Sequence, residues 1–226
     1  MTTVLVMAAH PDDEVLGCGG TIARHAARGD EVHVVLVADG TSSRPGAVGR
    51  RDLIEARAAQ AAEAARLLGA QPPRLLGLPD QRLDSASLLD LTQALERVLG
   101  DVRPSIVYTH HGADLNLDHR LVFQAVLTAC RPVPGSSVTK IYTFETMSST
   151  EWSAPAIGSG FQPSRFVDIS DEFETKLSAL AAYVSEMREF PHPRSIEAVK
   201  ALALFRGASA GLRAAEAFEV IRDIER

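Results

Sequence analysis

A short apolar run that ends in an acidic turn constrains the fold of this 226-residue chain more than any other feature. Residues 4–9 are apolar and partly β-branched, which predicts a strand that is buried on both faces. The residues that follow are His10, Pro11, Asp12, Asp13 and Glu14. Open α/β sheets bind ligands beyond the carboxyl ends of their strands, so these polar groups stand where a site is expected. Asp12 or Asp13 could cap the next helix, but capping does not account for all four polar side chains.

The alternation of apolar runs and amphipathic segments predicts an α/β fold. We expect a three-layer α/β/α sandwich with a Rossmann-like, mostly parallel sheet, formed by one domain over residues 1–226. Further strands are expected at residues 31–38, 74–78, 105–109, 140–144 and 165–169. Helices are expected at residues 15–29, 50–68, 87–99, 121–130, 171–188, 195–206 and 214–224, and a Ser-, Gly- and Pro-rich loop at residues 41–49.

Charge and composition argue against several classes of partner. The net charge of −6 disfavours nucleic acid or an anionic membrane surface as the main partner. No apolar run approaches the roughly 20 residues of a membrane span, and the first residues lack the pattern of a secretory signal. Cys18 and Cys130 are too few for a disulfide framework or a thiolate metal site. We therefore expect a cytoplasmic enzyme with two reduced thiols.

The polar groups at the first strand end indicate a metal site. His10 and Asp13 are three residues apart, and zinc accepts both imidazole nitrogen and carboxylate oxygen. A catalytic zinc usually has three protein ligands and a fourth position for water, so another strand end should supply the third ligand. The loop after the fourth strand offers His110, His111 and His119. Spacing in the sequence does not choose among these three histidines.

Two motifs resemble the LmbE-like or PIG-L family of zinc-dependent N-deacetylases, which act on N-acetylglucosaminyl-inositol compounds. They are residues 9–14 with the glycine-rich residues 17–20, and the later pair Asp118-His119. The likeness covers the N-terminal two-thirds of the chain, including the helix at residues 57–69. It implies that His10, Asp13 and His119 bind Zn²⁺ and that Asp12 is the general base. A site of two histidines and one aspartate also accepts other divalent metals.

The chemistry of amide hydrolysis agrees with these roles. Zinc lowers the pKa of bound water to about 7, which makes this water a nucleophile at neutral pH. A carboxylate that is not a ligand can take the proton of this water and pass it to the leaving amine. The resemblance thus implies removal of an N-acetyl or other small N-acyl group from a small N-acetylglucosamine-like molecule. Members of the family often assemble, so a homo-oligomer is compatible with the resemblance.

Four further residues are candidates for substrate contact or support of the ligands. Glu14 matches a family position that contacts sugar hydroxyls, but a carboxylate in a first helical turn also suits the helix dipole. Arg57 matches a substrate-contacting arginine, and a solvated helix face is the competing interpretation. Asp80 is a weaker candidate for sugar contact. Asp118 is expected to orient a ligand or the base.

One position departs from the family pattern. Many members have a histidine three residues before the last metal ligand, where this chain has Asn116. Asparagine can donate a hydrogen bond to an oxyanion but cannot deliver a proton. His192, His110 or His111 could substitute for the missing histidine, and His192 could equally be a structural turn residue.

Two functions from other classes compete with the hydrolase. The glycine-rich residues 17–20 and Asp39 at the next strand end suggest a Rossmann-type nucleotide-binding protein. However, the third glycine of that fingerprint would fall at Ile22, and the carboxylates before the glycines would repel a pyrophosphate. The second alternative, a non-catalytic carbohydrate-binding module, would not need the general base.

Overall fold

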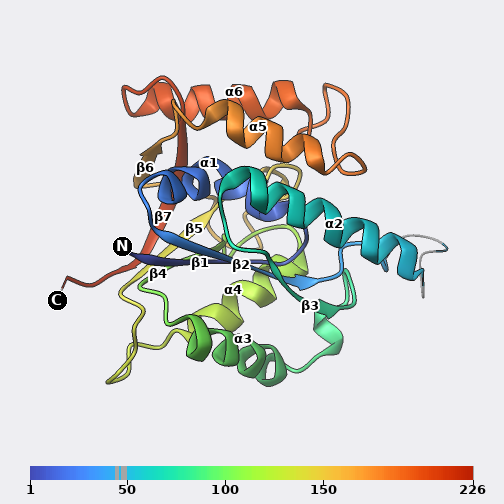
Figure 1. Cartoon of the computed structure of the whole chain (residues 1–226), viewed down its shortest axis with the longest axis vertical. Coiled ribbons are helices and arrows are strands. Elements are labelled where there is room, and N and C mark those ends of the chain that lie inside the picture. The colour runs from blue at the N-terminus through green and yellow to red at the C-terminus, as the bar shows by residue number, and fades with distance from the viewer. Residues whose placement is uncertain (44–45, 47–49, 226) are drawn as a thin grey trace.

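A seven-stranded sheet organises the chain in the computed structural model, which describes residues 1–43, 46 and 50–225 (Figure 1). The loop expected at residues 41–49 therefore lies partly outside the described residues. The strands are β1 (Thr3–Ala8), β2 (Glu31–Ala38), β3 (Arg74–Leu78), β4 (Ile106–His110), β5 (Lys140–Phe144), β6 (Arg165–Asp168) and β7 (Ala215–Asp223). Their order is β3-β2-β1-β4-β5-β7-β6. Among the described strands, β7 is antiparallel to both of its neighbours, β5 and β6, and the other neighbouring pairs are parallel.

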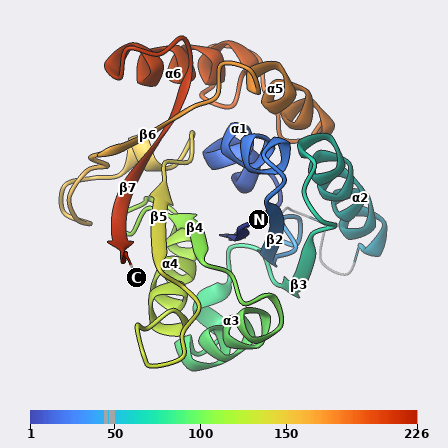
Figure 2. The ribbon, with the colours of Figure 1, turned by 60° about the vertical axis from the view of Figure 1, so that its left-hand side comes forward.

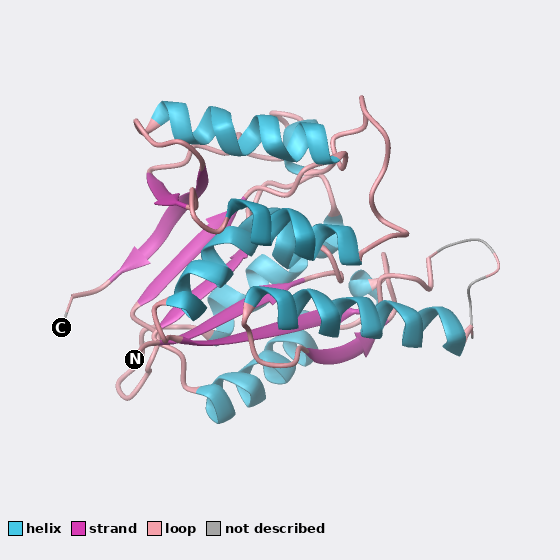
Figure 3. Ribbon diagram, turned by 45° about the horizontal axis from the view of Figure 1, so that its top comes forward, coloured by secondary structure: helices cyan, strands magenta, loops and turns pink. Residues whose placement is uncertain are grey.

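Helices cover both faces of this sheet (Figures 2 and 3). On one face lie α1 (Asp13–Ala27), α2 (Arg51–Leu68), α5 (Phe173–Ala182) and α6 (Ile196–Ser209). On the other face lie α3 (Leu88–Val102) and α4 (Leu117–Ala129), and short 3₁₀ helices occur at Leu83–Ser85 and Thr150–Trp152. The predicted α/β fold with a mostly parallel sheet is confirmed. In the described part of the chain, no helix has both the length and the apolar character needed to cross a bilayer.

Strand β1 lies between two apolar cores, as its sequence predicts. Val4 and Val6 belong to the core under α1 and α2, whereas Leu5 and Met7 belong to the core that α3 and α4 cover. All four side chains are fully buried. Because each apolar side chain removed from water contributes roughly 1.5–3 kcal/mol, this double burial stabilises the strand that leads to His10.

A crevice is expected at the centre of the sheet, beyond the carboxyl ends of β1 and β4. β1 and β4 are parallel neighbours, with Leu5 in register with Val107. The chain leaves β1 for α1 on one face and leaves β4 for α4 on the other, so a crevice opens between the two strand ends. His10 follows β1 and the loop of residues 111–116 follows β4, which brings the two chemically rich segments to the same edge.

The prediction of a helix at residues 214–224 is wrong, because this segment forms strand β7. Its alanines and glutamates favour a helix locally. Instead it pairs with β5 and with β6, for example Tyr142 with Val220, and buries Ala217 and Phe218. Pairing with the otherwise open edge of β5 outweighs the intrinsic propensity of the segment.

The helix expected at residues 171–188 is too long, because α5 ends at Ala182. The next residue, Tyr183, is fully buried, and its hydroxyl donates to Glu14 Oε1 (2.5 Å). The chain leaves the helix where this side chain turns inward toward the β1–α1 turn. Residues 183–195 then form a loop that returns to the same turn.

Candidate active site

The backbone of the turn after β1 directs the Asp12 side chain away from helix α1. Asp12 has φ 121° and ψ −29°, a conformation that costs a non-glycine residue roughly 1–3 kcal/mol. Its N–H donates to Glu14 Oε2 (3.1 Å), and its carbonyl accepts from the Leu16 N–H (2.9 Å). Asp12 occupies the N-cap position, but its side chain makes no capping hydrogen bond to the described residues. Capping therefore does not explain this carboxylate.

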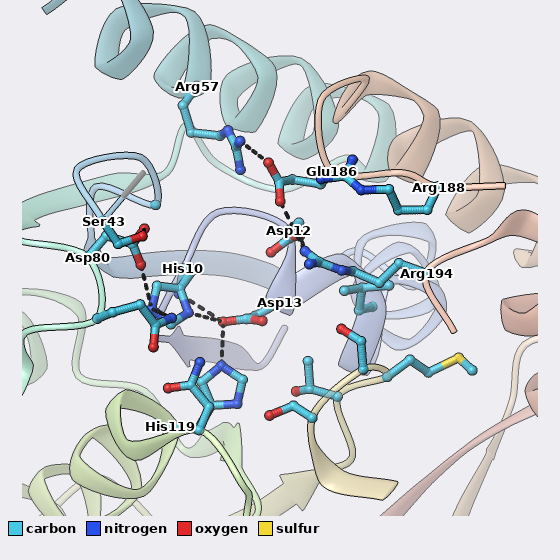
Figure 4. A pocket seen from close by; sticks show the side chains of 18 residues that line it. His10, Asp12, Asp13, Ser43, Arg57, Asp80, His119, Glu186, Arg188 and Arg194 are labelled. Carbon is cyan, nitrogen blue, oxygen red and sulfur yellow. Dashed lines mark hydrogen bonds and ion pairs between the residues drawn. The ribbon is translucent and has the colours of Figure 1, made fainter. Parts of the chain in front are cut away.

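Three side chains that could bind a metal meet beside a cavity of about 470 Å³ (Figure 4). Asp13 Oδ2 lies 3.1 Å from His10 Nδ1 and 3.2 Å from His119 Nε2. The three candidate ligand atoms lie within 4.8 Å of one another, and all three residues are buried. In the described part of the chain, neither ring nitrogen of His119 has a hydrogen-bond partner of good geometry. Two imidazole nitrogens and one carboxylate oxygen suit zinc, so these residues fit a divalent metal.

Carboxylates face the opposite ring nitrogens of both histidines. His10 Nε2 lies 3.1 Å from Asp118 Oδ2 and 3.2 Å from Asp80 Oδ1. His119 Nδ1 lies 3.2 Å from Asp114 Oδ1. Carboxylates in this position fix the tautomer and the orientation of metal-binding histidines. Asp80, expected as a weak candidate for sugar contact, thus lies against His10.

The surrounding carboxylates make this cluster attractive to cations. Burial lowers the pKa of His119, but Asp13 and Asp114 raise it to about 9. Burial also lowers the pKa of His10, yet Asp118 and Asp13 raise it well above its usual 6.5. Burial raises the pKa of Asp13, but the two histidines hold it well below 3.8. A raised pKa means that both histidines hold a proton at neutral pH, so a divalent metal would have to displace these protons to bind.

The Asp12 carboxylate lines the same cavity, and a closed chain of ion pairs and hydrogen bonds, here called the ring, restrains it. Arg194 Nη1 lies 3.1 Å from Asp12 Oδ2 and 3.0 Å from Glu186 Oε2. Glu186 also pairs with Arg57, whose Nη1 donates to the Pro11 carbonyl (3.2 Å). The ring thus begins and ends on adjacent residues of the β1–α1 turn. Burial and the neighbouring carboxylate raise the pKa of Asp12 to about 8, against the charge of Arg194.

Of the other residues predicted from the sequence, some line the cavity and others lie behind its wall. Arg57 and Asn116 line the cavity. Arg57 is buried, so the solvated helix face is not its environment. The described cavity lining does not include Glu14, which is buried behind the turn between the Asp12 N–H and the Tyr183 hydroxyl. Burial raises the pKa of Glu14 to about 7.

The structure distinguishes the three histidines at the end of β4 and beyond it. His110 Nε2, the ring nitrogen that faces Asp13, accepts a hydrogen bond from the Ala9 N–H (2.8 Å). The lone pair of this nitrogen is therefore already used. Burial and the charge of His119 lower the pKa of His110 to about 3. His111 bonds instead to Glu219 Oε2 (2.7 Å). His119 is thus the one of the three that joins His10 in the three-residue cluster.

His192 is separate from the cavity, whose described lining does not include it. Its Nδ1 accepts from the Arg194 N–H (3.0 Å) within the loop of residues 183–195. Sequence reasoning missed Glu186 and Arg194, which contact the Asp12 region from that loop. The adjacent motif at residues 191–194, with two prolines, was the only local signal of a fixed turn there.

Sequence comparisons relate the chain to proteins described as deacetylases. The sequence model of PIG-L, GlcNAc-PI de-N-acetylase, matches residues 5–130. YaiS of Escherichia coli K12, described as an uncharacterized deacetylase, is 32% identical over 188 residues, covering 80% of this chain and 90% of YaiS. A 1D-myo-inositol 2-acetamido-2-deoxy-alpha-D-glucopyranoside deacetylase of Mycolicibacterium smegmatis is 29% identical over 250 residues, covering 89% of this chain and 86% of that protein.

A solved structure of different activity has the same fold. GalB, the 4-carboxy-2-hydroxymuconate hydratase of Pseudomonas putida KT2440, aligns with a TM-score of 0.80 and 25% identity. The alignment covers 100% of this chain and 99% of GalB. The fold alone therefore does not distinguish a deacetylase from a hydratase.

Proposed function

This chain belongs to the PIG-L family, and from that membership we propose that it is a zinc-dependent N-deacetylase of a small amino sugar. The substrate class is an N-acetylglucosamine-like molecule that carries an acetyl or another small acyl group on its amine. The observation that carries the proposal is the buried cluster of His10, Asp13 and His119, with the Asp12 carboxylate in the same cavity.

We assign His10, Asp13 and His119 as the metal ligands. When bound, a divalent ion supplies Lewis acidity to the amide carbonyl and to a water molecule. The arrangement of the ligands supports this assignment, because each histidine faces Asp13 with one ring nitrogen and another carboxylate with the second. Zinc is the ion that this set of nitrogen and oxygen donors suits, although such sites also take other divalent metals.

We assign Asp12 as the general base. A carboxylate beside the ligands can accept a proton from the attacking water and then deliver it to the nitrogen of the leaving amine. Arg194 supports this role because its hydrogen bond to Oδ2 restrains the carboxylate. The backbone conformation of Asp12 also supports this role, because its side chain makes no capping hydrogen bond to helix α1 among the described residues.

We assign Asn116 as a neutral donor to the developing oxyanion. Its Oδ1 accepts from the Asp118 N–H (2.9 Å) and so caps helix α4. Because the oxygen is used by the cap, the amide NH₂ is available to donate toward the cavity that Asn116 lines. Asparagine cannot deliver a proton, which leaves proton delivery to Asp12.

Metal analysis coupled to amine release would test this function. Purified protein would be assayed for bound metal and for amine release from N-acetylglucosamine and its simple glycosides. Asp12→Asn is the test variant, and Asp52→Asn, an exposed residue of α2, is the matched control. We expect about one zinc per chain in all three proteins and a loss of roughly 10²–10⁴ in kcat for Asp12→Asn only.

Three results would contradict parts of the proposal. Absence of bound metal, with no amine release after zinc, iron or cobalt is added, would exclude a metal-dependent deacetylase. Full activity of Asp12→Asn would exclude Asp12 as the base. Hydration of an unsaturated carboxylic acid without amine release would instead place the chain with GalB in activity.

A further inference from the structure

Tyr183, the first residue after α5, links this helix to the turn after β1. Its side chain is fully buried and belongs to the core under α1 and α2. Helix α5 packs against both of these helices (Figure 2). The phenol ring is therefore held by packing, and its hydroxyl donates to Glu14 Oε1 (2.5 Å) in the first turn of α1.

Glu14 connects Tyr183 to Asp12. One carboxylate oxygen, Oε1, accepts from the Tyr183 hydroxyl, and the other, Oε2, accepts from the Asp12 N–H (3.1 Å). Glu14 is only 3% exposed, and the described lining of the cavity does not include it. Each oxygen thus has a donor from the protein, and the carboxylate lies behind the cavity wall, where a sugar hydroxyl does not reach it.

The peptide between Pro11 and Asp12 is held at both of its polar groups. Its N–H donates to Glu14 Oε2, and its C=O accepts from Arg57 Nη1 (3.2 Å). The next peptide is held by helix α1, because the Asp12 carbonyl accepts from the Leu16 N–H (2.9 Å). The angles φ and ψ of Asp12 describe the relative orientation of these two planar peptides, so contacts on both sides fix the angles.

The conformation of Asp12 needs such contacts. Its φ of 121° is one that strains a residue with a side chain, and it persists only when the surrounding structure over-determines it. The backbone angles also set the direction in which the Asp12 side chain leaves the chain. The hydrogen bond between Asp12 and Glu14 therefore acts on the position of a carboxylate in the cavity, although Glu14 is outside the described lining.

Tyr183 also reaches the Asp12 carboxylate by a second route. Its carbonyl accepts from the Glu186 N–H (2.9 Å), which fixes the first turn of the loop of residues 183–195. Glu186 Oε2 lies 3.0 Å from Arg194 Nη1, which in turn lies 3.1 Å from Asp12 Oδ2. The backbone and the carboxylate of Asp12 are thus both held by contacts that begin at Tyr183.

We propose that Tyr183 and Glu14 are positioning residues for Asp12: the tyrosine hydroxyl fixes the Glu14 carboxylate, which holds the Asp12 backbone so that the Asp12 side chain stays in the cavity. This role rests on the proposed function, in which Asp12 is the base. It replaces the sugar contact that the family resemblance implies for Glu14. A shift of about 1 Å at a reacting group can lower the rate by about 10²-fold, so loss of these bonds should appear in kcat rather than in KM.

Two substitutions of Glu14 separate positioning from sugar contact. With zinc-loaded protein and the methyl glycoside of N-acetylglucosamine, we expect Glu14→Ala to lower kcat by about 10- to 100-fold and to leave KM within about twofold. Glu14→Gln should retain most of the wild-type kcat, because its amide oxygen can accept from the Asp12 N–H while its NH₂ donates to the Tyr183 hydroxyl oxygen. Glu55→Ala, at an exposed residue of α2, is the matched control and should keep wild-type kinetics.

Tyr183→Phe removes only the hydroxyl, and two backgrounds show whether the tyrosine acts through Asp12. In the wild-type background we expect this substitution to lower kcat by about tenfold. In the Asp12→Asn background it should cause no further loss, because the base that it positions is already absent. A purely structural role would lower kcat by the same factor in both backgrounds. Zinc content measured on the same samples corrects kcat for the metal-loaded fraction.

The kinetic results can overturn the proposal in three ways. Wild-type kcat in Tyr183→Phe, or the same loss in both backgrounds, would show that the tyrosine does not act through Asp12. Equal losses of kcat in Glu14→Gln and Glu14→Ala would exclude positioning by hydrogen bonds, since the amide keeps both of them. A raised KM with unchanged kcat in both Glu14 variants would return Glu14 to sugar contact.

A structural measurement separates this proposal from the proposed function. If the wild type releases no amine, the proposed N-deacetylation fails, and crystal structures of the wild type and Tyr183→Phe decide the positioning instead. A changed φ of Asp12 in Tyr183→Phe would then support the role of the tyrosine hydroxyl, and an unchanged φ would overturn it.

Discussion

Asp114 Oδ1 lies 3.2 Å from His119 Nδ1, on the side of the ring that faces away from Asp13. The Asp114 carboxylate also accepts hydrogen bonds from the hydroxyls of Ser149 and Thr150. Burial raises the pKa of Asp114, but the His119 ring and these hydroxyls lower it to about 2. Asp114 is therefore held as an anion beside His119 Nδ1, while His119 Nε2 faces Asp13.

We predict that Asp114→Asn weakens zinc binding by about 10- to 100-fold, because the ring of His119 loses its charged partner. Competition with a chromophoric chelator at constant pH would measure the dissociation constant. Asp101→Asn, at an exposed residue of α3, is the control and should bind zinc as the wild type does. Unchanged affinity in Asp114→Asn would mean that the carboxylate does not orient a ligand.

Variants of Asn116 can separate its role in the helix cap from its role in catalysis. Asn116→Ser retains a capping oxygen for α4 but removes the NH₂ donor. We predict that it lowers kcat by about 10²–10³, the usual effect of removing one oxyanion donor, with little change in stability. Kinetics and urea unfolding on the same protein would measure both quantities.

Asn116→Ala provides the comparison, since it removes both the cap and the donor. It should lose as much kcat as Asn116→Ser and also about 1 kcal/mol of stability. If Asn116→Ser keeps full activity, Asn116 is only a capping residue. The missing histidine of the family would then have no functional replacement at this position.

The part of the site that follows β1 was predictable because its signal is local. Apolar residues end abruptly at His10, so the strand end and the polar turn can both be located in the sequence. The choice of His119 was not predictable from spacing, since His110 and His111 follow the same strand. Contacts distant in sequence distinguish them, such as the hydrogen bond from Ala9 to His110 and that of His111 to Glu219.

The C-terminal part of the chain was less predictable because tertiary contacts decide its structure. The segment of β7 has helical propensity and becomes a strand only because β5 offers an open edge. Glu186 and Arg194 resemble charged residues of a solvated segment. Their role near Asp12 depends on the end of α5 at Ala182, which the sequence pattern does not mark.

A buried ion pair joins β7 and α5 to helix α1. Lys176 Nζ lies 2.6 Å from Glu216 Oε1, and both side chains are 4% exposed. The lysine also donates to the Leu16 carbonyl (2.9 Å). Glu216 accepts from the N–H groups of Gly20 and Thr21, at 2.8 and 2.7 Å. The Lys176–Glu216 pair therefore satisfies backbone groups of the helix that follows the β1–α1 turn.

We predict that Lys176→Met lowers the free energy of unfolding by about 3–5 kcal/mol, because Glu216 is left as an unpaired buried carboxylate. Urea unfolding followed by circular dichroism would measure this loss. Lys200→Met, at an exposed residue of α6, should change the stability by less than about 0.5 kcal/mol. A loss below about 1 kcal/mol for Lys176→Met would show that water reaches Glu216.

The pair of His111 and Glu219 should make stability depend on pH. Burial lowers the pKa of His111, but the hydrogen bond and charge of Glu219 raise it above 6.5. Burial raises the pKa of Glu219, but His111 and the Gln162 N–H lower it below 4.5. The contribution of His111 is thus complete below its unfolded pKa and is lost as pH rises through its raised folded pKa. The contribution of Glu219 is lost as pH falls through its lowered folded pKa.

A double-mutant cycle with His111→Gln and Glu219→Gln would measure this pair. We expect a coupling of about 1 kcal/mol or less at about pH 5.5, because Glu219 is only partly buried and water therefore screens the pair in part. The coupling should decrease at a pH above the raised folded pKa of His111, because the imidazole loses its proton as pH rises through that pKa. Urea unfolding of the four proteins at both pH values provides the measurement. Equal coupling at the two values would mean that a neutral hydrogen bond, rather than the charge of His111, stabilises the contact.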